Sequence, residues 1–192
     1  MDAVKKFFAF LTAVLFLLAG CGREEEYPGI GVSILTRYID TVEEPFLQDV
    51  LDAHTDIECS VIPIATGHFE NDPSAAMGGL VKLTSLIAAN EVDVLVSSMA
   101  EAERQAAADT FAPLSDAFTA EELAGFEQVS FEVVDDQGVE GALHNIPCGI
   151  LLTDPEISSL DESGMALFLI SNTQNPDAAR EIFLVIAEMY AK

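Results

Sequence analysis

The chain has 192 residues, with 8 basic and 33 acidic side chains and a formal net charge of −25. Half of its residues are hydrophobic, which is enough for one domain with a substantial core. The acidity argues against nucleic acid as a partner, because so few cations cannot displace the counterions around phosphates. It also argues against electrostatic docking on anionic lipid, and it favours neutral or cationic small ligands.

The first twenty residues are typical of a secretory signal. Lys5 and Lys6 precede an apolar run of twelve residues, which is too short to span a membrane. The next segment, Leu18-Ala19-Gly20-Cys21, resembles the lipobox of bacterial lipoproteins. This resemblance implies cleavage before Cys21 and transfer of a diacylglycerol to its thiol. The alternative, a transmembrane helix with an incidental cysteine, is disfavoured by the length of the apolar run.

We therefore expect a signal peptide over residues 1–20, a tether over 21–29 and a single α/β domain over 30–192. Residues 22–28 are polar, charged and without periodicity, as in a solvated spacer. Without residues 1–20, 6 basic and 32 acidic side chains remain. The acyl chains must then supply the anchoring, because two or more of them hold a protein stably to a membrane. We expect the protein on the extracytoplasmic face of the cell membrane.

The first part of the domain alternates between strands and helices, which is typical of a parallel sheet with right-handed crossovers. We expect three strands, at 30–39, 59–64 and 92–96. Pro63 cannot donate a hydrogen bond to a ladder, so the second strand should lie at a sheet edge. The helices are expected from Pro45, from Asp72-Pro73 to about Ala89, and over about 100–109.

The second part of the domain is less regular. Thr119 to Glu122 is a capping-box pattern that opens a short helix. Residues 129–143 predict a hairpin around Asp135 to Gly138. A strand over 149–152, a polar loop over 154–164, a strand over 165–170 and a helix after Asn175-Pro176 complete the expected order.

Four segments resemble extracellular solute-binding lipoproteins of ABC importers. They are residues 87–94, 111–116, 137–147 and 172–183. The resemblance implies one lobe of a type II periplasmic-binding protein: a three-layer α/β sandwich with a mostly parallel five-stranded sheet of order 2-1-3-n-4. It also implies that the protein serves as the substrate-binding component of an ABC permease.

The chain departs from this family in having no room for a second lobe. Only about twenty residues separate Pro147 from the last expected strand, whereas a compact domain needs about fifty. We therefore expect a single lobe that binds a small polar ligand without catalysis. The alternative is a degenerate lobe that docks onto another envelope protein.

Ligands of open α/β sheets sit outside the carboxyl ends of the parallel strands. Hydroxyls, amides and helix N-termini at those ends suit a polar small molecule. The alternative is that these residues are caps and loop residues without a ligand. The candidate ligand-binding residues are Arg37, Tyr38, Thr66, Gly67, Ser97, Ser98, Asn172 and Thr173.

Catalytic, metal and cofactor sites are not expected. His144 and Cys148 would share a strand face but stand over ten ångströms apart, given a rise of roughly 3.3 Å per residue. The acidic residues of 154–162 lack the glycine-centred loop of a calcium site. Cys59 and Cys148 could form a disulfide outside the cytoplasm or remain free thiols, and the sequence leaves this open.

Overall fold

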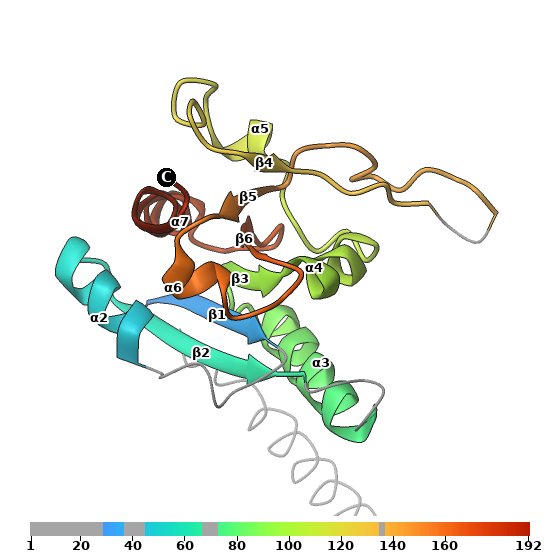
Figure 1. Cartoon of the computed structure of the whole chain (residues 1–192), viewed down its shortest axis with the longest axis horizontal. Coiled ribbons are helices and arrows are strands. Elements are labelled where there is room, and N and C mark those ends of the chain that lie inside the picture. The colour runs from blue at the N-terminus through green and yellow to red at the C-terminus, as the bar shows by residue number, and fades with distance from the viewer. Residues whose placement is uncertain (1–28, 37–44, 67–72, 135–136) are drawn as a thin grey trace, which may run out of the picture.

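The computed structural model describes residues 29–36, 45–66, 73–134 and 137–192 (Figure 1). In these residues one six-stranded sheet has the order β2-β1-β3-β6-β5-β4. The strands are β1 (Ile30–Thr36), β2 (Cys59–Ala65), β3 (Val94–Ser98), β4 (Gln128–Val129), β5 (Gly149–Leu152) and β6 (Met165–Leu169). The helices are α2 (Pro45–His54), α3 (Pro73–Ala88), α4 (Met99–Ala106), α5 (Leu114–Ala117), α6 (Pro155–Ser158) and α7 (Pro176–Tyr190).

Helices cover both faces of the sheet, which confirms the three-layer α/β arrangement (Figure 1). On one face α2 and α7 pack on alternate residues of β1 and β3, including Val32 and Val94. On the other face α3 and α4 pack on Leu35 and Leu95. Because β1 and β3 are apolar on both faces, neither helix layer is dispensable for burying them.

The parallel half of the sheet follows the expected order 2-1-3. β1 lies between β2 and β3 and is parallel to both, with Val32 opposite Val61 on one side and Val94 on the other. Among the described strands β2 pairs with β1 alone, so Pro63 stands in an edge strand as predicted.

The expectation of a mostly parallel five-stranded sheet of order 2-1-3-n-4 is wrong. The sheet has six strands, and β6, β5 and β4 are joined by antiparallel pairing, as is β6 to β3. The physical reason is the short link between β5 and β6, residues 153–164, whose only helix is the single turn α6. A parallel crossover is usually built on a full α-helix, which this link lacks, so β6 returns beside β5 in the opposite direction.

Three local expectations are corrected by the structure. The capping box forms, since Thr119 and Glu122 exchange hydrogen bonds, but the segment after it is a series of turns. The expected hairpin over 129–143 reduces to isolated bridges such as Val134 with Glu140. The polar loop over 154–164 contains α6, whose first turn is capped by Asp154 accepting the backbone N–H of Glu156.

Candidate functional site

Three of the predicted ligand-binding residues lie at the carboxyl edge of the parallel strands. Ser97 and Ser98 end β3, and Thr66 follows β2 directly. All three are fully buried. Four further predicted residues, Arg37, Tyr38, Gly67 and the lipidation residue Cys21, lie outside the described residues.

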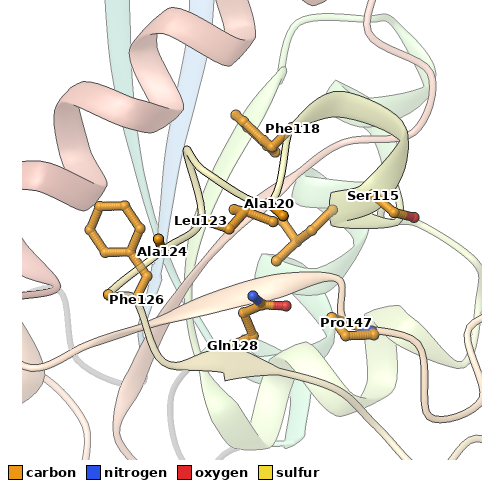
Figure 2. Close-up of a pocket in the computed structure, with 10 residues that line it drawn as sticks. Ser115, Phe118, Ala120, Leu123, Ala124, Phe126, Gln128 and Pro147 are labelled. Carbon is orange, nitrogen blue, oxygen red and sulfur yellow. The ribbon is translucent and has the colours of Figure 1, made fainter.

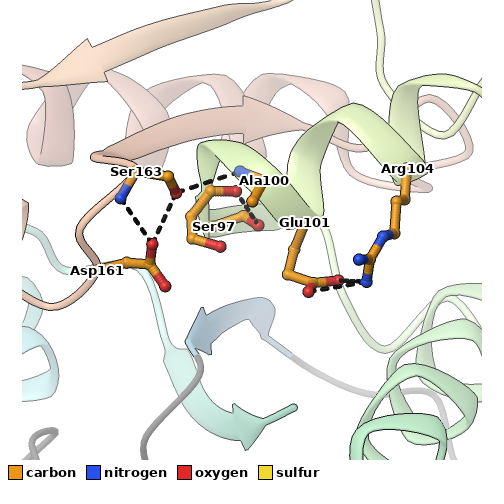
Figure 3. Close-up of polar contacts among 7 residues, drawn as sticks. Ser97, Ala100, Glu101, Arg104, Asp161 and Ser163 are labelled. Atoms are coloured by element: carbon orange, nitrogen blue, oxygen red, sulfur yellow. Dashed lines mark hydrogen bonds and ion pairs between the residues drawn. The ribbon is translucent and has the colours of Figure 1, made fainter. Parts of the chain in front are cut away.

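The loop that precedes β6 joins this edge. Because β6 is antiparallel to β3, its first residue, Met165, stands opposite Ser98. Asp161 and Ser163 therefore lie beside the end of β3, although neither was predicted as a site residue (Figure 3). No sequence signal marks them, since their place depends on the direction of β6.

Hydrogen bonds tie this loop to the start of α4 (Figure 3). The backbone N–H of Met99 donates to the carbonyl of Gly164 at 3.0 Å, and that of Ala100 donates to Ser163 Oγ at 3.3 Å. Ser163 Oγ in turn donates to Asp161 Oδ1 at 2.7 Å. The loop thus satisfies two of the amide donors that a helix leaves open at its N-terminus.

Glu101, in the first turn of α4, is a second buried carboxylate at this edge. Arg104 donates from Nη1 to both of its oxygens at 3.0 Å, and the Arg104 side chain is itself half exposed. Burial of a carboxylate is costly unless it is paired and hydrogen-bonded, and Arg104 supplies both. The Glu101 carboxylate is therefore buried at this edge of the sheet, while the Arg104 guanidinium that pairs with it reaches the surface (Figure 3).

Buried polarity is concentrated at this edge. Of the seven buried polar or charged side chains in the described part of the chain, five belong to it: Thr66, Ser97, Ser98, Glu101 and Asp161. Ser98 is the N-cap of α4, yet its side chain makes no capping bond, and among the described residues its Oγ has no hydrogen-bond partner. A buried polar atom left without a partner costs about 1–3 kcal/mol. We call these five residues the polar cluster.

Asn172 and Thr173 do not belong to the same site, and their grouping with the carboxyl ends is corrected. They follow β6, whose antiparallel direction carries them to the opposite edge of the sheet. There Asn172 Nδ2 donates to the carbonyl of Ile87 and to Asn90 Oδ1, while Thr173 bonds to Asp93. The side chains of Asn172 and Thr173 therefore stabilise turns of the fold through these hydrogen bonds.

The two cysteines of the domain are free thiols, Cys59 partly buried and Cys148 fully buried. Burial raises the pKa of each thiol to about 11, with the charge of Asp52 adding to the effect at Cys59. A protonated thiol is a weak nucleophile. His144 Nδ1 lies 3.0 Å from the carbonyl of Val133. Within the described ranges, no three His, Cys, Asp or Glu residues are placed to hold a metal ion.

No protein-family model, curated protein or solved structure matches the chain. In the part of the chain that the structure describes, every helix is too short or too polar to cross a bilayer.

Proposed function

We propose that the protein is a lipid-anchored binding protein that holds a small polar solute at the polar cluster. The observation that carries this proposal is the gathering of buried polar side chains at the carboxyl edge, where Ser98 Oγ has no partner within the part of the chain that the structure describes. Ligands of open α/β sheets bind at this edge. Polar side chains are buried less often than apolar ones, so their concentration at one edge is informative.

The chemistry of the cluster favours a ligand that donates hydrogen bonds. Asp161 and Glu101 supply carboxylate oxygens, and the serine hydroxyls can accept as well as donate. The net charge of −25 adds a field that attracts cations and repels anions. Polyols, sugars and small amines fit these requirements.

The single lobe limits how tightly the solute is held. A ligand bound at one edge stays partly in water, whereas high affinity requires burial of most of its surface. We therefore expect dissociation constants near the millimolar range, suited to a solute that passes on to a permease of the importer type. The parallel 2-1-3 strand order supports this assignment.

The anchor in this proposal is Cys21, acylated after removal of residues 1–20. An acidic protein gains no attraction from anionic headgroups, so the acyl chains alone hold it at the extracytoplasmic face. No step of catalysis enters the proposal.

Thermal shift against a panel of sugars, polyols, amino acids, small peptides and amines at millimolar concentration tests solute binding. At least one compound is expected to raise the melting temperature of the wild-type chain. Ser98→Ala should abolish that shift, whereas Ser115→Ala, at an exposed serine on α5, should retain it. Failure of every compound to stabilise the wild-type chain would contradict the proposal.

A second candidate function, docking onto another envelope protein, is favoured by a separate observation. An apolar hollow lies beside Pro147, and none of the residues that line it belongs to the polar cluster (Figure 2).

A further inference from the structure

The hollow beside Pro147 has a volume of about 650 Å³. Its lining includes Leu114, Phe118 and Leu123, which are nearly fully buried, and Phe126, which is partly exposed (Figure 2). The small side chains of Ala120 and Ala124 leave it open. A hollow of this size takes one or two large apolar side chains.

An acidic groove adjoins the hollow. It is lined by Leu184 and Val185 of α7 together with four carboxylates and one guanidinium: Glu122, Asp177, Glu181, Glu188 and Arg180. Glu122 precedes the hollow residue Leu123 and forms an ion pair with Arg180. The two depressions therefore meet at the turn over 118–123, and the groove carries an excess of three negative charges.

The chain's own cations already lie against the aromatic rings of the hollow. The guanidinium carbon of Arg180 is 5.8 Å from the centroid of Phe118, and Lys192 Nζ is 5.9 Å from the centroid of Phe126. Aromatic faces attract cations at such distances. The surface thus combines apolar, aromatic and acidic elements, each of which suits a positively charged amphipathic partner.

We propose that the hollow and groove together bind a cationic amphipathic helix of another protein. This inference rests on the second candidate function and names its partner by chemistry. An apolar side chain of the helix enters the hollow, and lysine or arginine residues run along the groove. The reason for a helix is the shape of α7, whose residues 177 to 188 span about 16 Å, or three helical turns.

Charge complementarity selects this occupant over two others. A second copy of the chain would bring a net charge of −25 against an acidic groove, which is repulsive. An anionic lipid surface would be repelled in the same way. A basic segment gains attraction along the groove and burial in the hollow.

The probe is an amphipathic peptide of about fourteen leucine and lysine residues at helical spacing. Its affinity is measured by fluorescence for the full chain held in nanodiscs of zwitterionic phosphatidylcholine, with empty nanodiscs as background. The wild type is expected to bind this peptide at least about tenfold more tightly than a peptide with glutamate in place of lysine.

Two variants locate the interaction. Ala124→Arg places a long cation at the exposed wall of the hollow, and Glu181→Lys with Glu188→Lys reverses the groove. Each should weaken peptide binding about tenfold. The matched control, Glu103→Lys with Glu132→Lys, makes the same charge change at exposed sites elsewhere. Its affinity for the peptide should stay within about twofold of the wild-type value.

Three results would overturn the proposal. One is equal binding by wild type, Ala124→Arg and the groove variant, and another is an equal loss in the control, which would indicate bulk charge alone. The third is a dimer in light scattering that Ala124→Arg abolishes, since it would make a second copy the occupant. Ser98→Ala should leave peptide binding unchanged. A failure of the peptide test therefore leaves the proposed solute site standing, and a failure of the solute test leaves the peptide site standing.

Discussion

Thr173 Oγ1 donates a hydrogen bond to Asp93 Oδ1 at 2.5 Å, and Asp93 Oδ2 accepts the backbone N–H of Gly31 at 3.0 Å. Asp93 is only 4% exposed. One carboxylate thus joins the start of β1, the residue before β3 and the turn after β6. This link explains why Thr173, a predicted ligand-binding residue, is instead part of the framework.

Thr173→Val should destabilise the fold. The substitution keeps the shape of the side chain but leaves a buried carboxylate oxygen without its donor, which costs about 1–3 kcal/mol. Thr84→Val is the matched control, because Thr84 donates only to the Leu80 carbonyl on the exposed face of α3. Thr84→Val should change the free energy of unfolding by no more than about 0.5 kcal/mol. Urea unfolding measures both, and equal effects of the two variants would refute the structural role.

Two glycines should respond to alanine in opposite ways. A Cβ at Gly31 would stand 1.9 Å from the carbonyl oxygen of Glu91, and backbone there cannot move aside. Gly31→Ala should therefore cost about 1–3 kcal/mol through overpacking. Nothing lies within 4 Å of a Cβ at Gly78 in α3, so Gly78→Ala should stabilise the helix by about 0.5–1 kcal/mol. Urea unfolding that gives both variants the same sign would contradict the packing described for β1.

Stability should fall between pH 9 and pH 11. Burial raises the pKa of Cys148 from 9.0 to about 11, and burial with the charge of Asp52 does the same at Cys59. The folded chain holds these protons more tightly than the unfolded chain does, so the stabilisation exists below pH 9 and disappears as the pH approaches 11. Burial also raises the pKa of Tyr190 to about 12, which continues the trend.

The urea midpoint measured at pH 8, 9.5 and 10.5 tests this expectation. Cys148→Ala should lower stability at pH 8 by removing a buried sulfur, but its midpoint should fall less steeply above pH 9 than that of the wild type. A wild-type midpoint that is flat across this interval would show that the buried thiols keep ordinary pKa values.

The proposed lipid anchor sets the number of titratable thiols. The chain has three cysteines, and Cys59 and Cys148 are free. Protein extracted from membranes and unfolded in guanidinium should therefore react with two equivalents of thiol reagent, because Cys21 carries a thioether. Mass spectrometry of its first peptide should show cleavage before Cys21 and added acyl chains. Three reactive thiols on a chain that retains residues 1–20 would exclude the anchor.

Local chemistry made much of the parallel half predictable. Pro63 places β2 at an edge because it lacks an amide hydrogen, and the alternation of strands and helices predicts a parallel sheet. The order 2-1-3, which the structure has, is what the resemblance to solute-binding lipoproteins implies. Pro45 and Pro176 begin helices as expected, because proline is favoured at the first helical position. Each of these predictions depends on the chemistry of a single residue or a short segment, and not on distant parts of the chain.

The direction of β6 could not be predicted in this way. Residues 165–169 are apolar throughout, as in any buried strand, and nothing in them distinguishes parallel from antiparallel pairing. That direction moves Asn172 and Thr173 away from the carboxyl edge and brings Asp161 and Ser163 to it. The place of Asp161 in the polar cluster therefore depends on topology instead of on local sequence.

A comparison of Ser98→Ala with Ser97→Ala asks whether the polar cluster exists for a ligand or for the fold. Both serines are fully buried at the end of β3, but Ser97 Oγ donates to the carbonyl of Ser98 at 3.1 Å, whereas Ser98 Oγ bonds to none of the described residues. Urea unfolding without ligand measures the free energy of unfolding of both variants. Ser97→Ala should lower it by about 1 kcal/mol, and Ser98→Ala should leave it unchanged or raise it by up to about 1 kcal/mol. A loss in Ser98→Ala as large as that in Ser97→Ala would show that the hydroxyl supports the fold, and the solute site would lose its basis.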